Sequence, residues 1–191
     1  MRFCFTFRPR FSSAVKAAFL DRDGVINVDY AYVHSRENFH FIPGALEGAA
    51  ELVRKGHQLI IVTNQSGIGR GKYSIDQFRE LTFWLAGVFA RNHAPLSAVY
   101  FCPHHPTHAF ALKDCDCRKP NPGMLLQAAR DLNIDLTQSV LIGDKTSDIQ
   151  AAKAAGLSKA VLVQSDGTKP WTECAVPHLQ TKDLLAAAKL L

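Results

Sequence analysis

Short apolar runs alternate with helical patterns along most of this chain. The runs are rich in Val, Ile, Leu and Phe, which is typical of strands buried on both faces of a sheet. The segments between them carry apolar residues at helical spacing. This alternation predicts an α/β fold, a doubly wound parallel sheet with helices on both faces. The expected strands are residues 15–20, 58–62, 98–101, 140–142 and 160–163, with helices beginning near residues 44, 74, 122, 146 and 181.

Acidic residues follow two of these expected strands. Asp21 and Asp23 come after the run 15–20, and Asp144 comes after the run 140–142 and one glycine. A single acid in such a place is often a turn former or a helix N-cap. Parallel strands, however, bring their carboxyl ends to one edge of a sheet, where ligands bind. Because Mg2+ takes carboxylates together with water and phosphate oxygens, the set predicts a magnesium-dependent phosphoryl-transfer site.

The charge and length of the chain restrict its partners. Its 191 residues carry 22 Lys and Arg against 17 Asp and Glu, a net charge of +5. The basic residues form no dense block, which favours a small anionic substrate over nucleic acid. No apolar stretch approaches the roughly 20 residues of a membrane-spanning helix. We expect a monomeric, cytoplasmic protein with no membrane partner, in which a domain at 14–191 follows a poorly ordered tail at 1–13.

Three of the five cysteines cluster in one segment. Ten residues separate the pair Cys102 and His104 from the pair Cys115 and Cys117, whereas Cys4 and Cys174 stand alone. Thiolates and an imidazole suit tetrahedral Zn2+, and four protein ligands make a structural site rather than a catalytic one. The odd count in a chain without a secretion signal argues against a disulfide framework. On the residues alone, His105 and His108 compete with His104 as the nitrogen donor.

Four short motifs in order resemble those of the haloacid dehalogenase (HAD) superfamily of phosphatases. They are Asp21-Arg22-Asp23-Gly24, Thr63-Asn64, Lys119 and Gly143-Asp144. The resemblance implies that Asp21 attacks phosphorus and forms an aspartyl-phosphate. It implies that Asp23 protonates the departing alkoxide and then deprotonates water. It also implies that Asp21, the Asp23 carbonyl and Asp144 bind Mg2+, and that Thr63 and Lys119 neutralise phosphate oxygens.

Longer stretches between Phe19 and Lys145 resemble the histidinol-phosphate phosphatase branch of that superfamily. They include residues 63–72, 100–106 and 115–120. The resemblance implies a single domain without a large cap, and it favours His104 over its neighbours as the zinc ligand. Asp148 would order metal-bound water or lie on a solvated helix face. The implied substrate-binding residues are Asp29, Tyr30, Ala31, Tyr32, Thr63, Asn64, Gln65, Ser66, Arg118, Lys119 and Lys145.

The branch contains phosphatases with different substrates. We expect a sugar-phosphate phosphatase that removes the C7 phosphate of a heptose 1,7-bisphosphate, in the supply of ADP-heptose for lipopolysaccharide core. Arg118 would hold the second phosphate through a bidentate guanidinium. The family often has a different pair in place of Tyr30-Ala31, so the anomer preference stays open. The alternatives are a histidinol-phosphate phosphatase and, against the intact motifs, a zinc-stabilised module that has lost catalysis.

Overall fold

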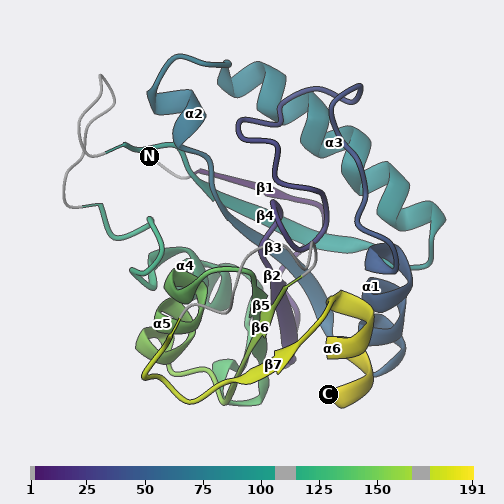
Figure 1. Ribbon diagram of the computed structural model, residues 1–191. Helices are drawn as coiled ribbons and strands as arrows, with labels where there is room; N and C mark the ends of the chain where they lie inside the picture. Colours follow the sequence, from purple (N-terminus) through teal and green to yellow (C-terminus); the bar gives the residue numbers. More distant parts are fainter. Residues whose placement is uncertain (1–2, 106–114, 165–172) are drawn as a thin grey trace.

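Seven strands form one sheet in the computed structural model, which describes residues 3–105, 115–164 and 173–191 (Figure 1). The strands are β1 (Cys4–Thr6), β2 (Ala17–Leu20), β3 (Gln58–Asn64), β4 (Leu96–Cys102), β5 (Val140–Gly143), β6 (Lys159–Val163) and β7 (Leu179–Thr181). Their order is β1-β4-β3-β2-β5-β6-β7. All neighbours are parallel except β1, which runs antiparallel to β4. The sheet therefore has the parallel core that the sequence predicts, with β2 at its centre.

Helices cover both faces of this sheet. They are α1 (Ala45–Arg54), α2 (Ser66–Gly69), α3 (Ile75–Arg91), α4 (Gly123–Leu132), α5 (Thr146–Ala155) and α6 (Leu184–Leu190), with a 3-10 turn at Leu136–Gln138. Figure 1 shows α1, α3 and α6 on one face and α4 and α5 on the other. The predicted doubly wound α/β fold is confirmed.

The continuous apolar strands follow from this two-sided covering. Successive residues of a strand point to opposite faces. In β2, Ala18 and Leu20 pack in the core under α1, α3 and α6, whereas Ala17 and Phe19 pack in the core under α4 and α5. All four side chains are fully buried. The central strands therefore have no solvent side on which a polar residue would be tolerated.

The amino-terminal segment differs from the prediction. Residues 1–13 are expected to form a tail outside the domain, yet Cys4–Thr6 pair with β4, with Cys4 opposite Tyr100. Phe3, Phe5 and Phe7 alternate along the segment and pack against the core under α3. The Phe5 ring stacks on Phe101 at 5.5 Å between centroids. This period-2 alternation is the signal of an edge strand, and the neighbouring arginines obscured it.

The carboxyl-terminal segment begins differently from the prediction too. The helix expected from residue 181 starts at Leu184, because Leu179–Thr181 first pair with β6. The Asp183 side chain then caps the helix by accepting the Ala186 N–H at 2.7 Å.

A membrane-spanning helix was not expected from the sequence. Within the described part of the chain, no helix has the length and apolar character that a span requires.

Candidate active site and metal-binding cluster

The ends of β2 and β5 bring three carboxylates together. Leu20 and Ile142 are partners in these neighbouring parallel strands, so Asp21 and Asp144 leave the sheet side by side. Asp148, from α5, lies close to both. One carboxylate oxygen from each of the three residues lies within 4.8 Å of the other two. Two acids that are 123 positions apart in sequence thus share one edge of the sheet, as the motif spacing predicts.

Gly24 and Gly143 each lie close against one of the acids, Gly24 against Asp144 and Gly143 against Asp148. A Cβ at Gly24, which has φ +89°, would lie 2.2 Å from Asp144 Oδ2. A Cβ at Gly143 would lie 2.3 Å from the Asp148 Cβ. Close approach of backbone and carboxylate is possible only without a side chain at these positions. The glycines in the two motifs therefore make room for the acids.

The electrostatics of this carboxylate group suit a divalent cation. Burial, reinforced by Asp148, raises the pKa of Asp21 despite the nearby Lys119. Burial, and then repulsion by Asp21, raises the pKa of Asp144 to about 7. A cation among the oxygens would favour the ionised form of each acid. Because the donors are all hard oxygens, these residues fit Mg2+.

Lys119 lies beside the acids and is almost completely buried. Its Nζ is 3.0 Å from Asp21 Oδ1 and 2.6 Å from Asp148 Oδ1, and it donates to the Val62 carbonyl at 2.8 Å. Burial alone lowers the pKa of Lys119, but Asp148 and Asp21 more than offset this and the net shift is upward. Lys119 is therefore a fixed ammonium directed at the Asp21 carboxylate.

Asn64 holds the backbone of Lys119 in place. Its Oδ1 accepts the Lys119 N–H, and its Nδ2 donates to the Lys119 carbonyl, both at 3.1 Å. The end of β3 is in this way fastened to the segment that carries the lysine. One amide hydrogen of Asn64 is left for a substrate.

Asp23 is surrounded by hydrogen-bond donors. Its carboxylate accepts from the Arg22 guanidinium at 2.9 Å, the Asn27 amide at 2.9 Å and the Gln65 amide at 3.0 Å. Burial by itself raises the pKa of Asp23, but Arg22 and the other donors outweigh it, so the pKa lies below its usual value. Without substrate, Asp23 is an ionised carboxylate.

Asp21, Asp23, Asn64 and Lys119 line one polar cavity of about 430 Å³. Its cations are Arg118, Lys119 and Lys145, which match an anionic ligand. Lys145 is half exposed and lies between Asp29, at 3.4 Å, and Asp144, at 3.2 Å. The lining residues are Asp21, Asp23, Asp29, Ala31, Tyr32, Thr63, Asn64, Gln65, Ser66, Gly67, Tyr73, Arg118, Lys119, Lys145 and Ser147.

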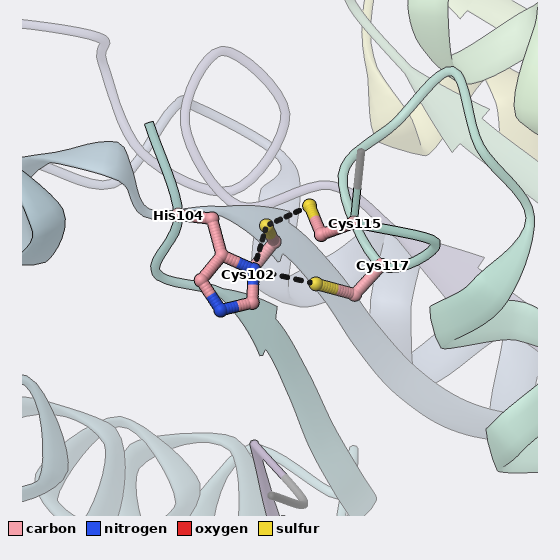
Figure 2. A group of neighbouring side chains, drawn as sticks. All are labelled: Cys102, His104, Cys115 and Cys117. Atoms are coloured by element: carbon pink, nitrogen blue, oxygen red, sulfur yellow. Dashed lines mark hydrogen bonds between the residues drawn. The ribbon is translucent and has the colours of Figure 1, made fainter. Parts of the chain in front are cut away.

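A second cluster gathers three sulfurs around a ring nitrogen (Figure 2). Cys102 Sγ is 3.7 Å from both Cys115 Sγ and His104 Nδ1, and Cys117 Sγ is 3.3 Å from His104 Nδ1. Zinc with ordinary bond lengths gives tetrahedron edges of about 3.8 Å between sulfurs and about 3.6 Å between sulfur and nitrogen. The hydrogen bond from Cys102 is the largest of the effects that lower the pKa of Cys117 to about 6, which favours the thiolate that a metal binds. The four side chains therefore fit Zn2+.

The sulfur cluster is joined directly to the cavity. Cys117 precedes Arg118 and Lys119 in the chain, and the Arg118 guanidinium donates to the His104 carbonyl at 3.4 Å. On the other side, the Gly69 N–H from α2 donates to the Pro103 carbonyl at 3.0 Å. A metal here would fix the segment that carries two cations of the cavity.

Comparison with known proteins shows the family to which the chain belongs. A protein-family model described as HAD-hydrolase-like matches residues 116–187. A D-glycero-beta-D-manno-heptose-1,7-bisphosphate 7-phosphatase of Vibrio cholerae is 51% identical over 162 residues, which are 84% of this chain and 86% of the relative. The chain belongs to this phosphatase family of HAD-like hydrolases. The phosphatase of the same name from Escherichia coli K12 is 48% identical and covers 81% of this chain and 82% of its own length.

A solved structure of the family agrees with the fold. The D,D-heptose 1,7-bisphosphate phosphatase of B. bronchiseptica, complexed with magnesium and phosphate, is 32% identical and superposes with a TM-score of 0.77. The match covers 92% of this chain and 97% of that one. The family resemblance found in the sequence is thus confirmed over most of the chain.

Most of the residues predicted from sequence lie together, with some exceptions. Tyr30 is 61% exposed, packs its ring edge against His40 and does not line the cavity. Asp144 lies close to Asp21 and Asp148 but is not among the residues that line the cavity. His105 contacts Arg70 rather than the sulfurs. His108 lies outside the described residues.

Asp148 differs from one of its predicted alternatives. It is fully buried, so it does not lie on a solvated helix face. Its Oδ2 accepts the Lys145 N–H at 3.0 Å, which caps α5, while Oδ1 faces Lys119.

Sequence reasoning missed four polar residues of the site. Arg22 and Asn27 contact Asp23, while Tyr73 and Ser147 line the cavity. Arg22 lies within the first motif and Asn27 follows it by three residues, so their position was a usable signal. Tyr73 and Ser147 had no signal, because each reads as an ordinary residue near a helix start.

Proposed function

We propose that this chain hydrolyses the C7 phosphate of D-glycero-beta-D-manno-heptose 1,7-bisphosphate. The observation that carries this proposal is the position of Asp21, in a cavity that also holds three cations and next to two further carboxylates. The chain is 51% identical to a phosphatase of that name. The β anomer is proposed because the relatives' name specifies it. The same motifs fit histidinol-phosphate phosphatases equally well, but the 51% sequence identity favours the heptose bisphosphate as substrate.

Asp21 is the proposed nucleophile. Its carboxylate oxygen forms a bond to phosphorus while the bond from phosphorus to the C7 oxygen breaks, and water later attacks the aspartyl-phosphate to release inorganic phosphate. Lys119, held by Asp148, steadies the Asp21 carboxylate and the phosphate oxygens. The Thr63 hydroxyl accepts from Gln65 at 2.9 Å, so its own hydrogen is free to donate to phosphate.

Asp23 is the proposed proton carrier. It gives a proton to the departing C7 oxygen in the first half of the reaction and takes one from the attacking water in the second. Mg2+, held by Asp21, Asp144 and the Asp23 carbonyl, would neutralise developing charge on the phosphoryl oxygens. Because Asp23 is ionised without substrate, we expect substrate to arrive with the proton or to raise the pKa of Asp23 through its own negative charge.

The remaining cations of the cavity are proposed to read the second phosphate. Arg118 and Lys145 line the cavity, and a guanidinium can hold a phosphate at C1 with two parallel hydrogen bonds. Asp29, Ala31, Tyr32 and Ser66, which also line it, would meet the sugar. Two of these, Ala31 and Tyr32, have positive φ values of 58° and 56°, a backbone conformation that costs free energy for a residue with a side chain.

The wider setting follows from the same proposal. We propose that the chain acts as a cytoplasmic monomer in the supply of ADP-heptose for lipopolysaccharide core, with Zn2+ in the cysteine cluster as a structural metal. A mass measurement under native conditions would test the zinc content and the monomeric state together.

Relative kcat/KM values test the substrate. We expect the β anomer of heptose 1,7-bisphosphate to exceed the α anomer, fructose 1,6-bisphosphate and histidinol phosphate, and activity to require Mg2+. A tenfold preference for histidinol phosphate, about 1.4 kcal/mol in transition-state free energy, would overturn the proposal.

A further inference from the structure

The Gln65 side chain has all of its hydrogen-bonding groups engaged inside the protein. Its Nε2 donates to Asp23 Oδ2 at 3.0 Å and to Thr63 Oγ1 at 2.9 Å. Its Oε1 accepts the Tyr73 hydroxyl. An amide nitrogen has two hydrogens, so these contacts leave no donor for a substrate. Gln65 is also only 2% exposed, although it forms part of the cavity wall.

Tyr73 and Asp23 select the same orientation of the Gln65 amide. A buried phenol that donates to Oε1 leaves Nε2 directed at Asp23 and Thr63, whereas the flipped amide would set a carbonyl oxygen against the Asp23 carboxylate. Tyr73 itself is fixed, since it is 5% exposed and its ring stacks on His34 at 5.0 Å between centroids. Gly67 lies against the same ring, because a Cβ there would be 2.2 Å from Tyr73 Cε1.

Arg22 and Asn27 hold Asp23 from its other side. Arg22 Nη2 is 2.9 Å from Oδ1 and 3.0 Å from Oδ2, and the same nitrogen donates to the Val33 carbonyl at 2.7 Å. Asn27 Nδ2 donates to Oδ1 at 2.9 Å and to the Val28 carbonyl at 2.9 Å. With Gln65 on Oδ2, both carboxylate oxygens are held by side chains that are themselves anchored.

We propose that Gln65, oriented by Tyr73, is a positioning residue for proton transfer by Asp23 and not a substrate contact. This inference rests on the proposed function and assigns a different role to a residue first expected to touch the sugar. As the Asp21 oxygen bonds to phosphorus, the C7 oxygen leaves and takes the proton from Asp23. The carboxylate that remains is stabilised by the donors already directed at it.

The leaving group of the substrate separates this role from a general structural one. A sugar alkoxide needs a proton in order to depart, whereas 4-nitrophenolate is stable without one. The ratio kcat/KM reports only the steps up to formation of the aspartyl-phosphate, so the later water attack does not enter it. We therefore compare kcat/KM for fructose 1,6-bisphosphate and the heptose bisphosphate with kcat/KM for 4-nitrophenyl phosphate.

Gln65→Met removes the amide at nearly constant size. We expect kcat/KM on the alkyl phosphates to fall about tenfold or more, part of the 10²–10⁴-fold value of general acid–base help, and that on the aryl phosphate to change less than about twofold. Tyr73→Phe removes only the hydroxyl that donates to the amide. It should lower kcat/KM on the alkyl phosphates relative to that on the aryl phosphate by at least about twofold. This variant provides the test if Gln65→Met does not fold. The matched control is Gln150→Met, at an exposed position of α5, which should leave both values unchanged.

Other results would overturn the inference. Equal losses on both substrate types would make Gln65 a structural residue, and a raised KM with unchanged kcat on the alkyl phosphates alone would make it a substrate contact. If neither variant changes kcat/KM on the alkyl phosphates relative to that on the aryl phosphate, Gln65 has no role in proton transfer. If the wild-type protein hydrolyses none of the phosphates, the proposed function fails instead, which the wild-type rates show before any variant is made.

Discussion

Gly24→Ala should disable the site through one added methyl group. The new Cβ would lie 2.2 Å from Asp144 Oδ2, where ordinary contact begins at 3.4 Å, so the carboxylate must move. That displacement is about 1.2 Å, and a misplacement of about 1 Å can cost about 10²-fold in rate. Alanine at φ +89° adds about 1–2 kcal/mol of backbone strain. We expect kcat/KM to fall about 100-fold and the apparent Mg2+ affinity to fall with it.

Gly156→Ala separates the strain from the displacement. Gly156 has φ +79°, close to that of Gly24, but no atom lies within 4 Å of its added Cβ. Both variants should lose about 1–2 kcal/mol of unfolding free energy in urea titrations. Only Gly24→Ala should lose activity in a Mg2+ titration of kcat/KM. Activities of the two variants within about twofold of each other would refute the argument that Asp144 must lie against Gly24.

Three further predictions concern the metal cluster and stability. Cys115→Ser should release zinc and lower activity while leaving Mg2+ affinity largely intact, as measured by metal analysis and Mg2+ titration; full activity in demonstrably zinc-free protein would contradict this. Phe3→Ala removes a ring whose edge packs on His104 at 5.2 Å between centroids, so zinc should pass to a chromogenic chelator faster than in Phe7→Ala, which alters the same segment away from the cluster; equal rates would count against this contact. Burial lowers the pKa of His57 from 6.5, so the unfolded chain takes up a proton that the folded chain does not, and unfolding free energy falls as pH drops below about 6.5. In urea titrations, the unfolding midpoint of His57→Leu should fall less between about pH 7.5 and about pH 5.5 than that of the wild type. The same fall in both proteins would contradict this prediction.

The parallel core of the fold could be predicted because its signals are local. Buried strands such as β2 and β3 are continuous apolar runs, and α3 begins with Ser74 and Gln77 in the reciprocal capping arrangement that their spacing indicates. The edge strands β1 and β7 are only three residues long, and β7 is largely exposed. The alternation of Phe3, Phe5 and Phe7 is the only local sign of β1, and β7 shows no such pattern, so the existence of β7 depends on pairing with its neighbour.

The site could be predicted where chemistry fixes the residue type. Asp21, Asp144 and the cysteine cluster are recognisable because metal and phosphate chemistry requires those groups at the ends of strands or at a tight spacing. Gln65 and Tyr73 are different, since their roles arise from side-chain contacts across the cavity wall. The resemblance places Gln65 near the substrate without saying what it touches, and it says nothing of Tyr73.

Trapping the covalent intermediate tests the central claim most directly. Protein quenched during turnover of a phosphate ester, reduced with borohydride and digested should contain homoserine at position 21, because reduction converts an aspartyl-phosphate to that residue. Protein treated in the same way without substrate should retain aspartate there. Homoserine at another acid, or unmodified Asp21 in an enzyme that is turning over, would contradict the account.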